Sequence, residues 1–248
     1  MIELKSRREI EKIAASCAIV AKALALAEEL VRPGVPTLEI DAKMRELIEK
    51  EGAKPSFLGY RGYPASTCIS INEVIVHGIP NGRRVEDGDL VSIDVGAYLN
   101  GYHGDAARTF LVGDVDEEKR KITQTVRESL EKGIAQVKAG KRLGNVSAAI
   151  QQHAESKGFS VVRSLVGHGI GREMHEEPQV PNFGMPGEGP LLKEGMTIAI
   201  EPMINAGTWE TETLADGWTI VTADRRISAH WENTVVVTAD GAEVLTVL

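Results

Sequence analysis

The sequence predicts a mixed α/β fold, of the α+β kind, in which two similar halves each place two helices before a group of β-strands. One observation is a pattern that occurs twice. In Gly88–Asp94 and again in Gly195–Glu201, a glycine is followed by a short strand-like run that ends in a carboxylate. A second observation is a pair of helical segments of equal length, Gly34–Gly52 and Gly140–Gly158, each bounded by glycines. Both repeats indicate that the fold consists of two fused copies of one unit. Their spacing is too long for the repeats of a solenoid.

The two halves are expected to form one domain. No low-complexity linker separates them, so we predict a single domain over residues 1–248, with pseudo-repeats of approximately 1–113 and 114–248. Since each half supplies one acidic strand, the expected arrangement is a central antiparallel sheet across a pseudo-twofold axis. Side chains alternate across a strand, so helices would cover one face of this sheet and the acids would meet on the other.

Two helices are predicted at the start of the first half. Ser6 and Glu9 have the spacing of a capping box, and the apolar residues after them recur at helical intervals up to about Val31. A second helix is expected from Thr37, which we interpret as its N-cap, to Gly52.

The β region of the first half should end in a hairpin. Asn100-Gly101 is a strong signal for a two-residue turn. In that register Asp94 faces Ala107, and Asp105 is the diagonal neighbour of Asp94 on the same face. A slipped register would place the two acids opposite each other without changing the face. The strands expected here are Cys68–Ile71, Val74–Val76, Leu90–Tyr98 and Tyr102–Val112.

The second half is expected to follow the same order. Helices are predicted from Asp116 and from about Asn145, each with apolar residues in phase. The segment Pro178–Pro190 is dense in proline and glycine, so we expect a functional loop there. The strands expected in this half are Met196–Ile204, Trp218–Thr222 and Trp231–Thr238.

Composition describes a globular protein and excludes several other classes. The formal net charge of -8 argues against a protein that coats nucleic acid, so we expect no nucleic-acid specificity. Apolar runs are too short to span a bilayer, and the amino terminus lacks the apolar core of a signal peptide. Cys17 and Cys68 are the only cysteines, which excludes a disulfide framework and a Cys-rich zinc site. A cytoplasmic location without membrane association is expected.

Four acids and a histidine are the candidates for chemistry. Asp94, Asp105, Glu201 and Glu232 each lie in or beside an apolar strand, where a carboxylate is costly unless it is paired or bound to metal. If they converge, two divalent cations would neutralise them, with His168 as a neutral ligand. Such oxygen-rich ligation suits Mn, Fe or Co more than a structural zinc site. Two ions roughly 3.5–4 Å apart would lower the pKa of a bridging water and polarise a carbonyl, which predicts hydrolysis without a covalent intermediate.

The sequence resembles the type I, bacterial-type methionine aminopeptidases. These enzymes belong to the M24 metallopeptidases and have the pita-bread fold shared with prolidase, aminopeptidase P and creatinase. The resemblance covers essentially the whole chain, and its motifs are specific in combination. They are Cys68-Ile-Ser-Ile-Asn-Glu73, His77-Gly-Ile-Pro80, Ile93-Asp94-Val95, His103-Gly-Asp105, Gly167-His168-Gly-Ile-Gly171, His175-Glu-Glu-Pro178, Glu201-Pro202 and Glu232-Asn-Thr234.

The resemblance implies specific roles for the acids and histidines. Asp105 and Glu232 would be shared between two metal ions, and Glu201 would also relay protons from the nucleophilic water. His175 would stabilise the tetrahedral intermediate, and His77 would position the substrate near the scissile peptide. The full set of implied metal ligands is Asp94, Asp105, His168, Glu201 and Glu232.

The resemblance also implies two further binding sites. Aromatic walls and a sulfur neighbour suit the flexible thioether of methionine, and the residues implied for that pocket are Tyr60, Tyr63, Cys68, Met174 and Trp218. Three positions depart from the bacterial pattern, which puts the shape of the pocket in doubt: Phe57, Arg61 and Met174 stand in place of cysteine, histidine and phenylalanine. The implied monovalent-cation site consists of Asn72, Val74 and Ser228.

We therefore expect a monomeric metalloaminopeptidase that removes the initiator methionine from nascent polypeptides when the second residue is small. Its cofactors would be two divalent ions (Co, Mn, Fe or Zn) and a monovalent cation. One alternative is an X-Pro dipeptidase or aminopeptidase of the same fold, although those relatives usually carry an extra amino-terminal domain. Another is a catalytically inactive pita-bread binding protein, although such proteins lose ligands. The basic patch Lys119–Lys121 raises the prospect of transient ribosome docking.

Overall fold

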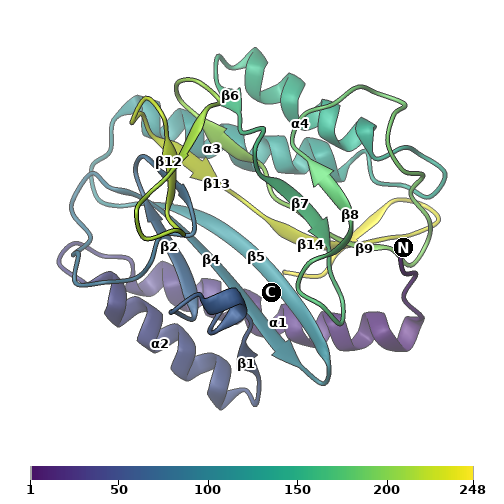
Figure 1. Cartoon of the computed structure of the whole chain (residues 1–248), viewed down its shortest axis with the longest axis horizontal. Helices are drawn as coiled ribbons and strands as arrows, with labels where there is room; N and C mark the ends of the chain where they lie inside the picture. The colour runs from purple at the N-terminus through teal and green to yellow at the C-terminus, as the bar shows by residue number, and fades with distance from the viewer. Residues whose placement is uncertain (1, 248) are drawn as a thin grey trace.

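The computed structural model describes residues 2–247 of the chain. Figure 1 shows a curved layer of strands with one pair of helices along each half, so the predicted mixed α/β architecture is confirmed. The helices are α1 (Arg7–Leu30), α2 (Thr37–Lys50), α3 (Glu117–Ile134) and α4 (Gly144–Ser156), with a short 3-10 turn, η1, at Tyr60–Gly62.

The strands follow the helices in both halves, in the predicted order. Those of the first half are β1 (Lys54–Pro55), β2 (Thr67–Ile71), β3 (Val74–Val76), β4 (Leu90–Leu99) and β5 (Tyr102–Leu111). Those of the second half are β6 (Ser160–Val161), β7 (Val166–Gly169), β8 (Glu176–Pro181), β9 (Thr197–Ile200), β10 (Met203–Asn205), β11 (Thr211–Thr213), β12 (Ile220–Thr222), β13 (Ser228–His230), β14 (Asn233–Val237) and β15 (Ala242–Val244).

All strand pairs among the described residues are antiparallel, but they do not form the single uninterrupted sheet that we expected. β4 and β5 belong to a sheet with β1 and β2, whereas β9 and β14 belong to a sheet with β7, β8 and β15. The two sheets meet where the amide of Glu232 donates to the carbonyl of Ala107 on β5, at 2.9 Å. The halves are therefore joined beside one of the predicted metal ligands.

The hairpin of β4 and β5 has the predicted register. Leu99 pairs with Tyr102 across Asn100-Gly101, and Asp94 pairs with Ala107. Both turn residues have positive φ, 53° and 88°, as a tight primed turn requires. Because Asp105 pairs with Gly96, two residues along from Asp94, the two acids are diagonal neighbours on one face.

The opposite face of each acidic strand forms the core. In β4, Val91, Ile93 and Val95 are fully buried against apolar residues of α1 and α2. In β9, Ile198 and Ile200 are fully buried in a second cluster that includes residues of α3 and α4. The alternation that we predicted for the repeated pattern is confirmed in both copies.

The predicted strands Met196–Ile204 and Trp231–Thr238 were too long. Met196–Ile204 is divided into β9 and β10 by Glu201-Pro202, whereas Trp231–Thr238 is shortened to β14, which Trp231-Glu232 separates from β13. Ile200 pairs with Asn233, and Met203 pairs with His230, in two different sheets. Proline has no amide proton to donate to a ladder, so the interruption at Pro202 releases both carboxylates from the regular pleat.

Two other local predictions were wrong. Thr37 does not cap α2 through its side chain, because its hydroxyl donates to the carbonyl of Asn81 at 3.0 Å and accepts from the Asn81 amide at 2.9 Å. It therefore anchors the loop that follows His77. Pro178–Pro190 is not a loop throughout, since its first residues belong to β8, which pairs with β7.

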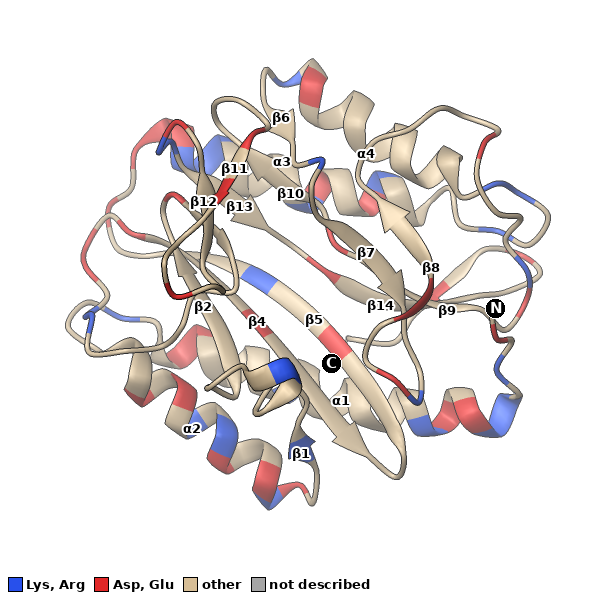
Figure 2. Cartoon of the chain, in the orientation of Figure 1, with Lys and Arg blue, Asp and Glu red and all other residues tan. Residues whose placement is uncertain are grey.

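Charged residues lie mainly around this core. Figure 2 shows that they gather on the helices and the outer loops, and that only a few coloured bands interrupt the central strands. Across residues 2–247, none of the helices combines the length and the apolar character that crossing a membrane would require.

Gly104 on β5 provides a test of how α1 packs on the sheet. A Cβ atom at this position would lie 2.6 Å from the backbone nitrogen and 2.8 Å from the Sγ atom of Cys17 on α1. We expect Gly104→Ala to lower the free energy of unfolding by about 1–3 kcal/mol through overpacking, as measured by chemical denaturation. Gly82→Ala is the matched control, because nothing lies within 4 Å of its added Cβ. Equal stability of the two variants would contradict this packing.

Candidate metal centre and substrate cavity

All five predicted metal ligands come together at the junction of the two halves. Two come from the hairpin of the first half and three from the second half. Asp94 lies on β4, Asp105 on β5, His168 on β7, Glu201 directly after β9 and Glu232 directly before β14.

The distances within this cluster are those of groups that face a common point. Nε2 of His168 lies 3.5 Å from Oε1 of Glu201 and 3.9 Å from Oδ2 of Asp105. One ligand atom each of Asp105, His168 and Glu232 lie within 4.8 Å of one another. The Nδ1 atom of His168 is 2.9 Å from the carbonyl of Gly169. We assign the proton to Nδ1, because it then donates to that carbonyl and leaves the Nε2 lone pair facing the carboxylates.

The donor set fits divalent cations. Oδ1 of Asp94, Oδ1 of Asp105 and Oε1 of Glu232 are buried and have no hydrogen-bond partner in the protein. A buried carboxylate oxygen without a partner is costly, and here a lone pair of His168 adds further negative potential. A cation coordinated by these atoms would remove that cost, and carboxylate with imidazole ligation suits Mn, Fe, Co and Zn.

Without a cation, the four acids are driven towards their protonated forms. Burial raises the pKa of Asp94 to about 7. Burial and neighbouring carboxylates raise the pKa values of Asp105, Glu201 and Glu232 well above their usual range. Burial lowers the pKa of His168 to about 4, so this imidazole is neutral at physiological pH, as a metal ligand must be.

A cavity of about 190 Å³ adjoins the cluster and unites it with the predicted substrate residues. All five predicted metal ligands and all seven predicted substrate-binding residues line it. The lining is Phe57, Tyr60, Arg61, Tyr63, Cys68, His77, Asp94, Asp105, His168, Met174, His175, Glu201, Trp218 and Glu232.

Two histidines stand on the cavity wall beside the acids. The ring of His175 is 4.3 Å from that of His168, and its Nδ1 atom is 2.8 Å from the hydroxyl of Tyr60. Burial lowers the pKa of His175 to about 3 and also lowers the pKa of His77. Both imidazoles are therefore neutral and can donate one N–H each without adding charge.

The remainder of the cavity is apolar and aromatic. Tyr63 and Trp218 meet edge to face, with ring centroids 5.1 Å apart, and Cys68 and Met174 complete the wall. Phe57, one of the three departures from the bacterial pattern, packs in the same cluster. These side chains form a slot that is open on one side to the carboxylates.

The three residues of the implied monovalent-cation site also lie near one another, but outside this cavity. The amide of Ser228 donates to the carbonyl of Asn72 at 2.9 Å. Val74 is in β3, which contacts β13, the strand of Ser228. One of the expected carbonyl ligands thus already accepts a hydrogen bond.

Sequence reasoning missed the side chains that hold the ligands in place. Arg108 is half-buried and donates to the carbonyl of Glu232 at 2.5 Å. Thr234 accepts from the amide of Asp105 at 3.2 Å and donates to its carbonyl at 2.8 Å. Asn182 donates to the carbonyl of Glu201 at 3.0 Å. All three contacts join segments that are distant in the sequence, so no local pattern could have revealed them.

The chain is similar to methionine aminopeptidases over its full length. Residues 11–239 match metallopeptidase family M24. A methionine aminopeptidase of Clostridium perfringens is 52% identical over 248 residues, which cover 100% of both chains. The crystal structure of a methionine aminopeptidase from Thermotoga maritima superposes with a TM-score of 0.98 at 46% identity, covering 100% of both chains.

A more distant likeness links the chain to prolidases. Prolidase from Pyrococcus furiosus has a TM-score of 0.80 at 30% identity, and the match covers 99% of this chain and 65% of that protein. The fold is thus shared with prolidase, while the identity is higher to the methionine aminopeptidases.

The raised pKa values predict how the stability of the metal-free protein depends on pH. The Asp94 carboxyl holds its proton more tightly in the folded state than at its ordinary pKa of 3.8. That stabilisation is lost as the pH rises through about 7. The histidines with lowered pKa values reduce the stability of the protein only below about pH 6.5, where the unfolded chain takes up protons that the folded protein does not. Between pH 6.5 and 8 we therefore expect stability to fall, by about 1.4 kcal/mol per pH unit for each proton held only in the folded state.

Chemical denaturation of protein treated with a chelator, at several values of pH in this range, measures the slope. Asp94→Asn should reduce it, because an amide does not titrate. Asp114→Asn is a matched control, since the Asp114 side chain is 94% exposed. A stability that stays constant or rises from pH 6.5 to 8 would contradict the assignment.

Proposed function

Because the chain belongs to metallopeptidase family M24, we propose that it is a methionine aminopeptidase, which removes the amino-terminal methionine of nascent polypeptides when the second residue is small. The observation that carries this proposal is that the five-ligand cluster and a slot of suitable shape for methionine share one small cavity. High identity to methionine aminopeptidases over the whole chain supports the same activity.

Divalent metal is required by this family, and five residues of the chain would hold it: Asp94, Asp105, His168, Glu201 and Glu232. We propose that two ions bind, because four carboxylates carry the charge of two divalent cations. When bound, these ions lower the pKa of a water molecule and polarise the carbonyl of the scissile peptide. Mn, Fe, Co and Zn all suit the donor set.

Glu201 is proposed to move the proton from the attacking water to the leaving amine. Its carboxylate sits at the break between β9 and β10, with Oε1 3.5 Å from Nε2 of His168 and Oε2 4.0 Å from Nε2 of His230. Burial and the neighbouring acids raise the pKa of Glu201 in the metal-free protein. With the cluster neutralised by cations, its ionised carboxylate would be able to accept a proton from the water and pass it to the amine.

His175 is proposed to donate a hydrogen bond to the peptide oxygen as negative charge develops there. If the Tyr60 hydroxyl donates to Nδ1 across 2.8 Å, the proton of the neutral ring resides on Nε2. A neutral N–H beside the metal cluster can stabilise an oxyanion by donating a hydrogen bond to it. His77, which lines the cavity near Trp218, is proposed to position the substrate.

The methionine side chain is proposed to occupy the slot formed by Tyr60, Tyr63, Cys68, Met174 and Trp218. A thioether makes favourable contacts with aromatic rings and with sulfur. The cavity is small, about 190 Å³, and the acids line it together with these side chains. Little space therefore remains beyond the first side chain, which favours a small second residue.

Neither alternative function has comparable support. An X-Pro peptidase would be consistent with the fold, but identity is 30% to the prolidase and 52% to the methionine aminopeptidase. An inactive binding protein would not need five converging ligands. Ribosome docking, a monomeric state and the monovalent cation remain predictions. The docking patch is partly occupied, because Lys119 donates to the carbonyl of Gly88 and Arg120 pairs with Asp114.

The proposed activity predicts metal-dependent cleavage with a defined selectivity. After metal removal the protein should not cleave peptides. Adding back Mn, Fe or Co should restore release of methionine from a Met-Gly peptide, with X-Pro peptides cleaved at most about one hundredth as fast, since an apolar slot and small subsite reject them. Cleavage is measured by chromatography of the products. Faster cleavage of X-Pro than of Met-Gly would favour the prolidase alternative instead.

Asp94→Asn tests the metal centre without disrupting the remainder of the fold. We expect this variant to fold but to lose at least about 100-fold in turnover, more than is typical for loss of an outer-shell partner. Asp114→Asn, with an exposed side chain far from the cavity lining, should keep its activity. Turnover of Met-Gly by Asp94→Asn at the rate of the unmodified protein would show that the metal assignment is wrong.

A further inference from the structure

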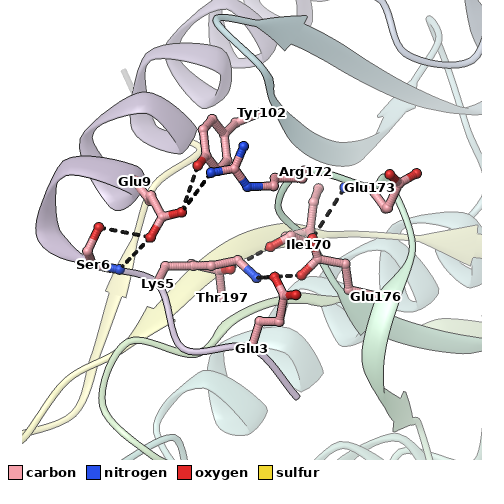
Figure 3. Close-up of polar contacts among 10 residues, drawn as sticks. All are labelled: Glu3, Lys5, Ser6, Glu9, Tyr102, Ile170, Arg172, Glu173, Glu176 and Thr197. Atoms are coloured by element: carbon pink, nitrogen blue, oxygen red, sulfur yellow. Dashed lines mark hydrogen bonds and ion pairs between the residues drawn. The ribbon is translucent and has the colours of Figure 1, made fainter. Parts of the chain in front are cut away.

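A buried lysine near the amino terminus contacts the loop that carries His175. Lys5 is 7% exposed, and its Nζ atom lies 2.5 Å from Oε2 of Glu176. A second carboxylate, that of the exposed Glu3, lies 3.5 Å away. Figure 3 shows the Lys5 side chain extended towards Glu176. Lysine is rarely buried unless it is paired, so this contact requires an explanation.

The surrounding backbone is shaped to receive Lys5. Its amide donates to the carbonyl of Gly195 at 2.8 Å. A Cβ atom on Gly195 would lie 2.7 Å from the Lys5 carbonyl, and one on Gly171 would lie 2.5 Å from Cε of Lys5 and 2.6 Å from Oε1 of Glu176. Two glycines thus leave space for the backbone and the stem of one lysine.

A second pair of contacts fixes the start of the same loop. Oε1 of Glu9 accepts from the Tyr102 hydroxyl at 2.8 Å and from Arg172 at 3.2 Å. The guanidinium of Arg172 lies 4.9 Å from the centroid of the Tyr102 ring. Hydrogen bonds from Ser6 and Tyr102 lower the pKa of Glu9 to about 2, so this carboxylate stays charged. Figure 3 shows both sets of contacts, those of Glu9 with Tyr102 and Arg172 and that of Lys5 with Glu176.

The loop between these contacts contains two residues that line the cavity. The carbonyl of Gly171 accepts from the amide of His103 at 2.8 Å, and the amide of Glu173 donates to Oε1 of Glu176 at 3.2 Å. Met174 and His175 lie between the anchored residues and line the cavity. Their positions therefore depend on Glu176, and the position of Glu176 depends on Lys5.

We infer that Lys5 is a positioning residue for His175, and that the amino-terminal segment of residues 2–9 is a structural part of the active site. The inference rests on the proposed function, because it assumes that His175 contacts the reacting peptide. Lys5 itself does not line the cavity and has no role in binding metal. Its ammonium acts through Glu176, the residue next to His175.

The strength of this effect follows from burial. Removing one partner of a buried ion pair leaves the other charge without compensation. In Lys5→Met, the Glu176 carboxylate would have to turn towards water, and the adjoining His175 would move with it. Displacements of about 1 Å in a catalytic group can cost roughly 100-fold in rate. Substrate affinity depends on the whole slot and should change less.

A double-mutant cycle on Lys5 and Glu176 tests the inference. We expect Lys5→Met and Glu176→Gln each to lower kcat on a Met-Gly peptide by about 10- to 100-fold, with KM changed less than about threefold. The double variant should lose no more than the more impaired single variant, since both act through one contact. Lys22→Met is the matched control, because Lys22 on α1 and Glu51 after α2 form a 2.6 Å pair that is more exposed. It should keep kcat unchanged.

Hydrogen exchange provides a readout that does not require activity. In metal-free protein, amides of residues 171–177 should exchange faster in Lys5→Met than in the unmodified chain, and they should be unaffected in Lys22→Met. Unchanged exchange in this loop, or additive losses of kcat in the double variant, would overturn the inference. If the unmodified, metal-loaded protein itself fails to release methionine, it is the proposed function that fails. The exchange data would still report whether Lys5 orders the loop.

Discussion

Mutual repulsion among four buried or partly buried carboxylates is the constraint on which the architecture of the site depends. Asp94, Asp105, Glu201 and Glu232 converge in one cavity, where burial and their neighbours raise their pKa values. Such a cluster costs stability in the absence of cations, and the remainder of the fold must offset that cost. It does so through the apolar faces of β4 and β9, which bury fully in clusters beneath the two helix pairs. Asp94 thus lies on β4, and Glu201 directly follows β9, two strands whose apolar faces are fully buried.

The duplicated halves contribute to the site in different ways. In the first half, the hairpin of β4 and β5 is continuous, and simple alternation places Asp94 and Asp105 on one face. In the second half, the strands are interrupted at Pro202 and at Trp231-Glu232. The interruption turns the amide of Glu232 towards Ala107 on β5, which joins the halves. Both halves supply proposed metal ligands, and the irregular half also supplies the residues proposed to move protons and to stabilise charge.

Much of this arrangement could be predicted from the sequence, because it depends on local patterns. The turn at Asn100-Gly101 determined the register of the hairpin, and alternation determined which face carries the acids. Motifs identified the cavity residues. The division of the predicted strand Met196–Ile204 was missed because β-propensity continues across Glu201. The contacts of Lys5, Arg108 and Asn182 were missed because each joins segments brought together only by the tertiary fold.

The central claim is that the acidic cluster holds protons when it is empty and exchanges them for divalent cations. Calorimetric titration of the metal-free protein with Mn²⁺ at pH 7, in buffers with different ionisation enthalpies, tests it directly. Since the pKa of Asp94 is about 7 and those of its neighbours are raised, the binding enthalpy should depend on the buffer. The dependence should correspond to release of at least about one proton per protein. Binding without proton release, or the absence of binding, would contradict the account.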